Sequence, residues 1–439
     1  MNLEQRIRDK KAKIGVVGLG YVGLPLAVEF ASKGFYTLGI DVDRRKIEKM
    51  NQGENYIQDV ENERFRGLVE SGMLEGTTKY GRAGELDVIY ICVPTPFTPN
   101  KEPDISYIEQ ATDSIAAHLR KEQLIVLKST TFPETTEKVC QPRLESTGLK
   151  VGKDFYLAFS PERIDPGRAD FTTANTPVVV GGVTEKCTKL AVLACEQVIS
   201  KVQAVSSPRT AEMVKLLENI FRSVNIALVN ELAMLCDRMG NIDVWEVVGA
   251  AATKPFGFMP FYPGPGIGGH CILVDPYYLS WKAKEFDFHS DFIELAARTN
   301  ENMPYYVLDL LVRSISANGV PLKTAKYLFV GAAFKKNVDD TRNSPAVKVM
   351  ELLIQRGAKN VAYNDPYVPE LKINGITFVS QELTDDNIRD KDCVIITTDH
   401  SSYDIDNIVK HAKLIVDTRN ATKAVTKGRE KIVRLGSGS

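Results

Sequence analysis

The stretch Lys13-Ile-Gly-Val-Val-Gly18-Leu-Gly20-Tyr-Val-Gly23 decides the fold of the first third of the chain. Its apolar run predicts a buried strand, and its glycines open an amphipathic stretch that predicts a helix. Strand, glycine-rich turn and helix in this order are typical of a dinucleotide-binding unit, because the turn lets a pyrophosphate approach backbone N–H groups at the helix start. We expect the cofactor contacts of this turn to be Gly18, Gly20, Tyr21, Val22 and Gly23.

The next predicted strand, residues 36–40, ends at Asp41. A carboxylate at this position binds the ribose hydroxyls of NAD and repels the 2′-phosphate of NADP. Arg44 and Arg45 follow closely, and an arginine here is able to accommodate a 2′-phosphate, so NADP is the alternative. Because the carboxylate is already in place, we expect NAD, and we count Arg45 among the cofactor contacts.

Two further strands are predicted at residues 87–93 and 124–128, with a helix at 105–119 between them. The ends of such strands form the ligand crevice of this kind of sheet, so Pro94, Thr95 and Thr130 should line the nicotinamide side. The prolines are equally consistent with a stiff loop. Glu162 follows another strand, at residues 155–160, and is either a site carboxylate or a solvated loop charge.

The middle of the chain carries apolar residues at helical spacing between Pro208 and Gly240. They predict a helix of about thirty residues, roughly 45 Å long, which we expect to join two α/β halves and to pack against a partner subunit. Lys215 and Asn219 lie one turn apart on it and share one face. This face is either a solvated edge or a pair of donors for an oxyanion formed on a thiol adduct.

A second glycine-rich stretch, Gly264-Pro-Gly-Ile-Gly-Gly-His-Cys271-Ile-Leu-Val-Asp275, precedes a helix predicted at residues 276–285. Cys271 is a candidate nucleophile, because a helix amino end lowers the pKa of a thiol; the alternative is a small buried hydrophobe. Asp275 is a candidate site carboxylate and also a candidate N-cap. We expect no metal at His270, since no second ligand stands at a suitable spacing.

The last third predicts strands at residues 326–331, 360–365, 392–397 and 414–417, with a helix at 344–355. The expected fold class is α/β, with two Rossmann-like doubly wound sheet domains joined by a long central helix and a small helical domain. The expected domains are residues 1–205 for NAD, 206–315 for dimerisation and the cysteine loop, and 316–435 for a nucleotide sugar. The last four residues, 436–439, are expected to be a remnant outside the fold.

Composition excludes several classes of protein. A net charge of −1 over 439 residues argues against a nucleic-acid or membrane-surface binder. The apolar runs are too short to span a bilayer, and the amino-terminal residues lack the core of a signal peptide. Seven cysteines without a CxxC pair indicate neither a zinc site nor a disulfide framework. We therefore expect a cytoplasmic protein.

Six motifs in one order resemble the UDP-glucose/GDP-mannose dehydrogenase family across nearly the whole chain. These motifs are Gly18-Leu-Gly-Tyr-Val-Gly-Leu-Pro25, Lys128-Ser-Thr130, Ser160-Pro-Glu162, Lys215-x3-Asn219, Gly268-Gly-His-Cys271-x3-Asp275, and Phe334-Lys335 with Asp340-Thr-Arg342. The stretches at residues 254–266 and 275–284 look most like the UDP-N-acetylglucosamine branch of the family.

The resemblance implies an enzyme that oxidises the C6 alcohol of UDP-N-acetylglucosamine to a uronic acid with two NAD, for surface polysaccharide precursors. It implies that Cys271 captures the aldehyde, that Lys215 and Asn219 stabilise the oxyanion, and that Asp275 and Thr130 serve at the water. It also implies that Glu162 is a further site carboxylate and that Arg342 reaches the cofactor. The substrate contacts expected from it are Glu162, Lys215, Asn219, Phe261, Tyr262, Gly268 and Lys335.

Several alternatives stay open at this stage. The same chemistry on UDP-N-acetylgalactosamine, UDP-N-acetylmannosamine or UDP-glucose differs only around the sugar. The rings of Phe261 and Tyr262 pack either against an N-acetyl methyl or into the core of their own loop. A two-electron dehydrogenase of the β-hydroxyacid type would need neither the thiol nor a second α/β unit, and a non-catalytic nucleotide-sugar sensor would need no thiol or lysine. We expect a homodimer or a higher homo-oligomer.

Overall fold

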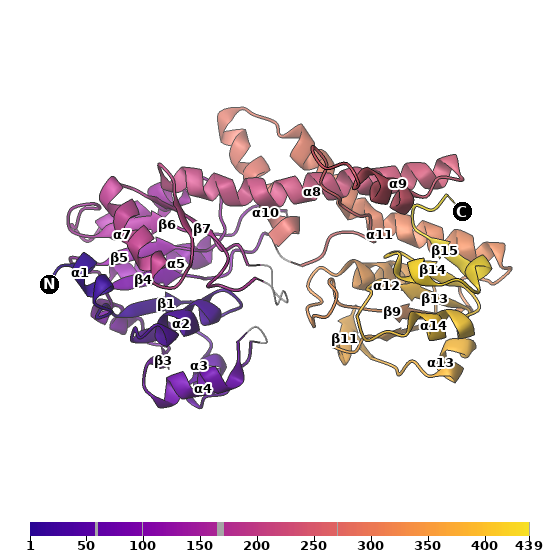
Figure 1. Cartoon of the computed structure of the whole chain (residues 1–439), viewed down its shortest axis with the longest axis horizontal. Helices are drawn as coiled ribbons and strands as arrows, with labels where there is room; N and C mark the ends of the chain where they lie inside the picture. Colours follow the sequence, from indigo (N-terminus) through magenta and orange to yellow (C-terminus); the bar gives the residue numbers. More distant parts are fainter. Residues whose placement is uncertain (58–59, 99, 165–170, 270, 439) are drawn as a thin grey trace. The chain divides into compact units, whose positions relative to one another are not determined.

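The computed structural model describes the chain except for residues 58–59, 99, 165–170, 270 and 439. The chain divides into two compact units, each built around its own sheet (Figure 1). Unit 1 comprises Met1–Glu218 and Tyr277–Phe288, and unit 2 comprises Asn219–Pro276 and His289–Ser439. The α/β fold class predicted from the sequence is confirmed, whereas the three domain boundaries stay a prediction.

The sheet of unit 1 has the strand order β3-β2-β1-β4-β5-β6-β7-β8. Its strands are β1 (Ile14–Val17), β2 (Thr37–Ile40), β3 (Leu74–Thr77), β4 (Val88–Ile91), β5 (Leu124–Leu127), β6 (Tyr156–Phe159), β7 (Val178–Gly182) and β8 (Val202–Ala204). The first six of these strands in spatial order repeat the order 3-2-1-4-5-6 of dinucleotide-binding sheets. Ligands of such sheets bind where the order reverses, which here is between β1 and β4.

Helices cover both faces of this sheet, because alternate strand residues belong to two separate cores. Val16 lies in one core with Ala27 and Phe30 of α2, and Val17 lies in the other with Ile108 of α5. The helices of unit 1 before α8 are α1 (Leu3–Arg8), α2 (Gly23–Ser32), α3 (Arg44–Asn51), α4 (Asn62–Glu70), η1 (Tyr80–Glu85), α5 (Ser106–Ala116), the π-helix η2 (Thr135–Cys140), α6 (Gln141–Glu145) and α7 (Glu185–Glu196).

β7 runs antiparallel to β6, unlike the other neighbouring strands of this sheet. Parallel pairing requires a crossover, usually a helix, and the described residues between β6 and β7 form none. β7 then pairs in parallel with β8 through the crossover helix α7. The alternating pattern of strands and helices did not reveal this reversal.

The sheet of unit 2 is parallel, with the order β10-β9-β13-β14-β15. Its strands are β9 (Lys326–Val330), β10 (Asn360–Asn364), β13 (Cys393–Ile396), β14 (Ile415–Asp417) and β15 (Ile432–Arg434), and β11 (Glu370–Ile373) and β12 (Ile376–Val379) form a separate hairpin. This is the 2-1-3-4-5 order of the second common doubly wound sheet, so its reversal lies between β9 and β13.

The remaining helices lie mainly in unit 2. They are α8 (Pro208–Met239) and α10 (Cys271–Ala283), which contribute residues to both units, η3 (Lys284–Phe286) of unit 1, and α9 (Val244–Ala251), α11 (Asp291–Ala317), α12 (Pro345–Gln355), α13 (Asp385–Asp390), α14 (Ile405–His411), η4 (Ala421–Ala424) and η5 (Arg429–Lys431). α8 has 32 residues and confirms the long helix predicted from the sequence.

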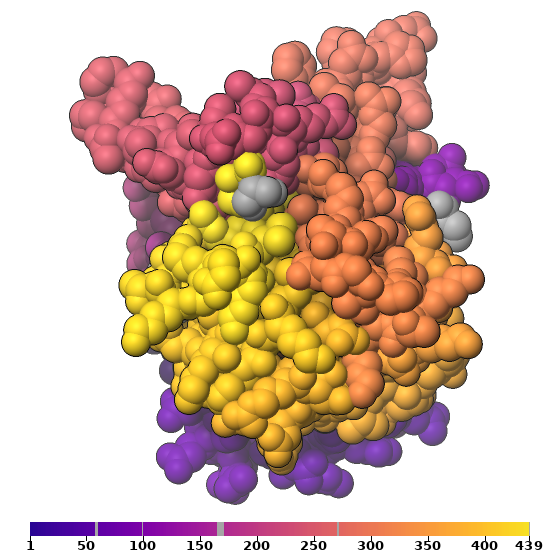
Figure 2. Space-filling model, turned by 90° about the vertical axis from the view of Figure 1, so that its right-hand side faces the viewer, coloured from indigo at the N-terminus to yellow at the C-terminus, as the bar shows by residue number. Residues whose placement is uncertain are grey.

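The described residues at the carboxyl end of the chain, 435–438, lie against α9 (Figures 1 and 2). The backbone N–H groups of Gly436 and Gly438 donate to Asp237 at 3.1 and 3.2 Å. The carbonyl of Gly436 accepts from Val244 N at 2.8 Å, next to the start of α9. Gly436 and Gly438 therefore contact the fold through hydrogen bonds, and the interpretation of residues 436–439 as a remnant stays a prediction.

None of the helices formed by the described residues is both long enough and apolar enough to cross a membrane.

Candidate active site

The glycine turn after β1 is closed on its sheet side and open on the other. A Cβ on Gly18 would fall 2.6 Å from the carbonyl oxygen of Cys92, and one on Gly23 would fall 1.8 Å from that of Gly18. A Cβ on Gly20 would meet no atom within 4 Å. The turn therefore packs tightly against the end of β4 and leaves open space at Gly20, where a pyrophosphate can approach the backbone.

Asp41 lies at the end of β2 and holds this turn in place. One of its carboxylate oxygens accepts from Leu19 N at 2.8 Å, and the other accepts from Asp43 N at 2.9 Å. Its side chain is buried, with Lys46 Nζ at 3.4 Å. The residues of the turn and Asp41 together fit the phosphate and ribose groups of NAD.

Arg45 is exposed and is paired with Asp43 at 2.9 Å. This guanidinium holds the pKa of the Asp43 carboxyl down to about 2, mainly through its side-chain hydrogen bond. The charge of Arg45 is thus compensated by Asp43, which weakens the case for a 2′-phosphate here.

The loops after β4 and β5 are joined by hydrogen bonds. Ser129 Oγ donates to the carbonyl of Val93 at 2.7 Å, next to the exposed Pro94. The buried Thr95 accepts at its carbonyl from the hydroxyl of Tyr278 in α10. Thr130, which follows Ser129, is half-buried. The structure thus brings Pro94, Thr95 and Thr130 to neighbouring strand ends, as the sequence predicted.

Glu162 forms a buried ion pair with Lys128, at 3.1 Å. It also accepts hydrogen bonds from Arg163 N at 2.8 Å and from Ile164 N at 2.9 Å. Burial opposes its ionisation, but the charge of Lys128 and these hydrogen bonds still leave its pKa below the ordinary value. Glu162 is therefore not the solvated loop charge that the sequence allowed; it is a fixed buried carboxylate.

In unit 2, the loop after β9, residues 331–344, holds the glycines that precede the cysteine; we call it the β9 loop. A Cβ on Gly268 would fall 2.4 Å from Cβ of Phe334, and one on Gly269 would meet the Phe334 ring at 2.9 Å. Gly269 N donates to the carbonyl of Arg342 at 2.9 Å, and Asn343 Nδ2 donates to the carbonyl of Gly269 at 3.0 Å. Lys335, which directly follows Phe334, belongs to the same loop.

Lys215 and Asn219 are buried on α8, so the solvated-edge alternative is wrong. Asn219 Nδ2 donates to Oδ2 of Asp275, which is also buried. The amide is thereby oriented, with its carbonyl oxygen directed away from this carboxylate.

Cys271 is the first residue of α10, but its side chain and His270 lie outside the described part of the structure. The predicted helix start at residue 276 is wrong, because α10 begins five residues earlier and contains Pro276. Asp275 is consequently inside the helix and is not its N-cap. A cysteine at the first position of a helix is where the helix dipole lowers a thiol pKa.

The rings of Phe261 and Tyr262 contact neighbouring rings of unit 2. Phe261 lies edge-on to Phe221 of α8, with centroids 5.8 Å apart, and Tyr262 stacks on Trp245 of α9 at 5.9 Å. These contacts correspond to the loop-packing alternative. A substrate contact by either ring stays a prediction.

Two residues next to the glycine loop were missed by the sequence analysis. A guanidinium nitrogen of Arg419 would lie 2.7 Å from a Cβ on Gly264, and Asn230 Oδ1 accepts from Gly264 N at 3.0 Å. Arg419 follows the carboxyl end of β14, and that position could have singled it out. Asn230 lies within an ordinary amphipathic helix, so the sequence carries no signal for it.

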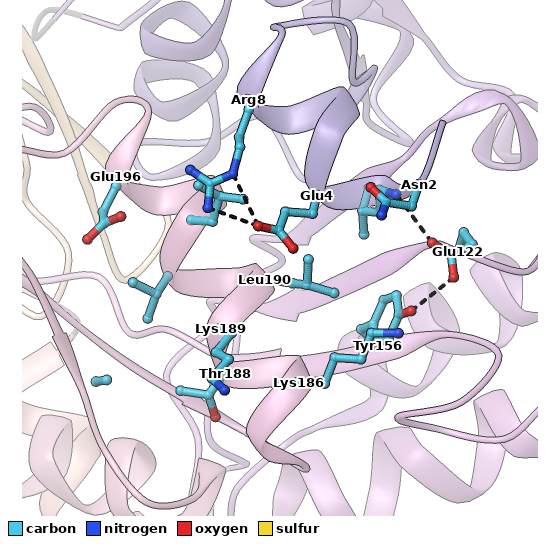
Figure 3. Close-up of a pocket in the computed structure, with 14 residues that line it drawn as sticks. Asn2, Glu4, Arg8, Glu122, Tyr156, Lys186, Thr188, Lys189, Leu190 and Glu196 are labelled. Carbon is cyan, nitrogen blue, oxygen red and sulfur yellow. Dashed lines mark hydrogen bonds and ion pairs between the residues drawn. The ribbon is translucent and has the colours of Figure 1, made fainter.

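A cavity of about 480 Å³ in unit 1 lies between α1 and α7, and the residues that line it include none of the predicted site residues (Figure 3). Arg8 and Glu4 pair at its edge at 2.9 Å, and Tyr156 donates to Glu122 at 3.0 Å. It lies at the amino ends of β5 and β6, whereas ligands of such sheets bind at the carboxyl ends. Among the described residues, no group of three or more His, Cys, Asp and Glu side chains could hold a metal ion.

The glycine turn, the carboxylate at Asp41 and the strand order of the first sheet define a dinucleotide-binding α/β protein with a second doubly wound sheet. The chain belongs to the UDP-glucose/GDP-mannose dehydrogenase family, whose NAD binding domain matches residues 12–199. The central domain of the family matches residues 209–302, and its UDP binding domain matches residues 328–424. NAD is therefore the cofactor, and the β9 loop lies in the UDP-binding part.

Two relatives and one solved structure bear on the substrate. The chain is 37% identical to a UDP-N-acetyl-D-mannosamine dehydrogenase of Pyrococcus horikoshii, over 94% of this chain and 96% of the relative. It is also 37% identical to a UDP-N-acetyl-D-glucosamine 6-dehydrogenase of Pseudomonas aeruginosa, over 82% of this chain and 84% of the relative. The solved UDP-D-ManNAc dehydrogenase from Pyrococcus horikoshii superimposes with a TM-score of 0.88 at 35% identity, covering 97% of this chain and 99% of that one.

Proposed function

We propose that the protein is an NAD-dependent UDP-N-acetylglucosamine 6-dehydrogenase that supplies a uronic acid for surface polysaccharide precursors. The observation that carries the proposal is the position of Cys271, at the first residue of α10 and directly after glycines held by the β9 loop. A nucleotide-binding loop that clamps a nucleophile loop fits a reaction at the sugar of a bound nucleotide. Family membership supports the same class of reaction.

The chemistry needs four electrons to leave the C6 carbon. NAD, when bound, supplies the hydride acceptor for each two-electron oxidation. The thiolate of Cys271 adds to the carbon of the aldehyde formed first, which gives a thiohemiacetal. Loss of the second hydride leaves a thioester, and water then releases the carboxylate and regenerates the thiol.

The other site residues serve this sequence without forming bonds to carbon. Lys215 and Asn219 donate hydrogen bonds to the oxyanion on the adduct. Asp275, with its orientation fixed by Asn219, accepts a proton from the attacking water, and Thr130 helps to hold that water. Glu162 contributes a fixed negative charge because Lys128 keeps it ionised.

UDP-N-acetylmannosamine is the second candidate substrate, because the relative from Pyrococcus horikoshii is named for it and covers nearly the whole chain. The two sugars differ in configuration at C2. The choice between them rests on the stretch 254–266, which resembles the N-acetylglucosamine branch. UDP-N-acetylgalactosamine and UDP-glucose remain weaker alternatives.

A substrate panel tests the proposal. Purified protein is mixed with NAD and UDP-N-acetylglucosamine, its manno or galacto epimer, or UDP-glucose, and the NADH formed is counted per sugar. We expect two NADH per UDP-N-acetylglucosamine and a markedly lower kcat/KM for UDP-glucose, since a pocket built for the N-acetyl group leaves polar atoms unpaired without it. A preference for the manno epimer would overturn the substrate and retain the chemistry, whereas one NADH per sugar would overturn the four-electron reaction.

The proposal includes a homodimer formed through α8. Seven large apolar side chains at helical spacing are exposed on that helix: Met213, Leu217, Phe221, Leu228, Leu232, Leu235 and Met239. A row of this length calls for a partner surface. We also place the protein in the cytoplasm, where the six described cysteines, all buried and free, would remain reduced.

A further inference from the structure

Asp365 and His400 form a fully buried pair next to the point where the strand order of unit 2 reverses. Asp365 follows β10, His400 follows β13, and the β9 loop lies between these two connections. Ligands of this kind of sheet bind in the crevice formed by such connections. Neither residue has a role in the chemistry described above.

Asp365 binds the start of the β9 loop. Its Oδ2 accepts from Ala332 N at 2.7 Å, from Ala333 N at 2.9 Å and from His400 Nε2 at 3.0 Å. Its Oδ1 accepts from Tyr367 N at 2.8 Å. Burial opposes ionisation, but these donors leave the pKa of Asp365 below its ordinary value, so it is a carboxylate at neutral pH.

The partners of His400 fix the protonation state of its ring. Asn337 N donates to Nδ1 at 2.9 Å, so Nδ1 carries a lone pair and no proton. Nε2 faces a carboxylate that has no proton, so Nε2 carries the hydrogen. The ring is therefore neutral and links the Asp365 carboxylate to the middle of the β9 loop, two residues beyond Lys335.

Other described residues after β13 also bond to the β9 loop, but none of them replaces the bond from His400 to the backbone of Asn337. Thr397 and Thr398 bind the carbonyls of Gly331 and Ala333, near the start of the loop, both at 2.6 Å. The side chain of Asn337 exchanges hydrogen bonds with Ser401, each at 2.9 Å. These contacts keep the two loops together, and within the part of the chain that the structure describes only His400 ties the backbone of Asn337 to the buried carboxylate.

Neighbouring side chains pack on the His400 ring. Asp365 is on the Nε2 side, and the rings of Tyr367 and Tyr403 lie against it with centroids at 5.0 and 5.4 Å. The neighbouring Asp399 lies 3.7 Å from both Lys336 and Arg419. The contacts of the ring hold its Nδ1 opposite the Asn337 N–H.

We propose that His400, oriented by Asp365, is a positioning residue for the nucleotide half of the substrate. Its neutral ring keeps the β9 loop in the form that presents Lys335 to the nucleotide. The inference rests on the proposed function in one respect, namely that this loop contacts the UDP moiety.

Two substitutions separate the two hydrogen bonds of the ring. His400→Asn places an acceptor where Nδ1 lies, and His400→Gln places a donor where Nε2 lies. His411→Gln is the matched control, since His411 is also nearly buried and pairs with Asp385, away from the β9 loop. Affinity for UDP-N-acetylglucosamine is measured by calorimetry without NAD, and KM and kcat follow from NADH formation. Circular dichroism and thermal unfolding check that each variant is folded.

At pH 8 we expect His400→Gln to weaken binding of the nucleotide sugar roughly tenfold, the effect of one lost hydrogen bond. KM for the sugar should rise in step, while KM for NAD and saturated kcat stay within about twofold. His400→Asn should lose less affinity, and His411→Gln should match the wild type. Wild-type affinity in His400→Gln would overturn the inference.

The comparison of the two variants gives the readout that a merely structural role would not move. A loss of fold stability would lower kcat and affinity in both variants, whereas loss of the acceptor at Nδ1 should raise KM for the sugar in His400→Gln more than in His400→Asn. Equal losses of affinity in His400→Gln and His400→Asn would overturn the inference, even if the variants proved less stable. If no UDP-sugar were oxidised but His400→Gln bound UDP-N-acetylglucosamine more weakly than His400→Asn, the proposed function would fail and the role of His400 would remain.

Discussion

At the scale of single residues, the sequence predicted candidate site residues but not the contacts that hold them. Asp41 was predicted from its position after β2 as a ribose ligand, and the structure adds its hydrogen bond to Leu19 N. Glu162 was undecided from sequence, because its partner Lys128 lies 34 positions earlier. Periodicity and motifs report on neighbours along the chain, whereas burial and charge pairing depend on residues that folding brings together.

The wild-type protein should prefer NAD over NADP by on the order of a hundredfold in kcat/KM, because Asp41 repels a 2′-phosphate. Asp41→Asn should lower this preference to below about tenfold by removing the charge, and it should also raise KM for NAD. The exposed Asp9→Asn, at the end of α1, is the control. Steady-state rates with NAD and with NADP measure this preference. Equal kcat/KM with the two cofactors in the wild type would show that Arg45 governs the pocket.

Cys271→Ser should retain the fold and both ligands but stop before release of the acid, because a serine hydroxyl ionises far less readily than a thiol. We expect kcat to fall at least roughly a thousandfold, within the range of an activated nucleophile. Cys236→Ser, on α8, controls for the loss of a thiol elsewhere. Wild-type NADH formation by Cys271→Ser would exclude the covalent route.

At the scale of elements, the local sequence pattern predicted the strands and the long helices, but it did not predict where every helix begins or where a helix is irregular. α12 begins at Pro345 and ends at Gln355, as Ser344-Pro345 and the apolar spacing predicted. α10 contradicts the same rule, because its Pro276 lies inside the helix. The π-helix η2 had no sequence signal, since Glu212 on α8 stabilises its start by accepting from Glu134 N at 2.7 Å and Thr136 N at 2.9 Å.

Burial raises the pKa of the Glu212 carboxyl from its ordinary 4.5 to about 7, although the donors of η2 favour the charged form. A raised acid pKa favours the neutral form in the folded state. The contribution of Glu212 to the free energy of unfolding is therefore most favourable below pH 4.5. It weakens as the pH rises and levels off above about pH 7. Between pH 5 and 7.5 the wild type should lose about 2 kcal/mol of stability relative to Glu212→Gln.

Urea unfolding of unit 1 measures this difference. Trp281 lies against Phe132 beside η2, with ring centroids 5.0 Å apart, and a Trp245→Phe background leaves it as the sole tryptophan. The exposed Glu70→Gln is the control and should follow the wild type at each pH. Parallel pH curves for the wild type and Glu212→Gln would contradict the prediction.

At the scale of the whole molecule, the sequence specified two doubly wound sheets and a long helix between them in sequence. It did not predict two departures from this arrangement. One is the antiparallel strand β7, and the other is the pair of hydrogen bonds that Gly436 and Gly438 donate to Asp237. Of the features of the whole molecule, the exposed apolar row on α8 is the one that most requires a partner surface. Every residue of such a row occurs twice in a two-fold symmetric interface, so a single substitution acts twice.

Leu228→Glu should convert the dimer to monomer at micromolar concentration, because it places two charges in the centre of an apolar interface. Loss of two buried leucines costs about 3 kcal/mol or more, which weakens the dimer at least roughly a hundredfold. Ile376→Glu on β12 is the matched control, since Ile376 is 54% exposed and Leu228 is 56% exposed. Sedimentation velocity should give a dimer mass for the wild type and the control and a monomer mass for Leu228→Glu. A monomeric wild type would exclude α8 as an interface, and a dimeric Leu228→Glu would move the interface to another face.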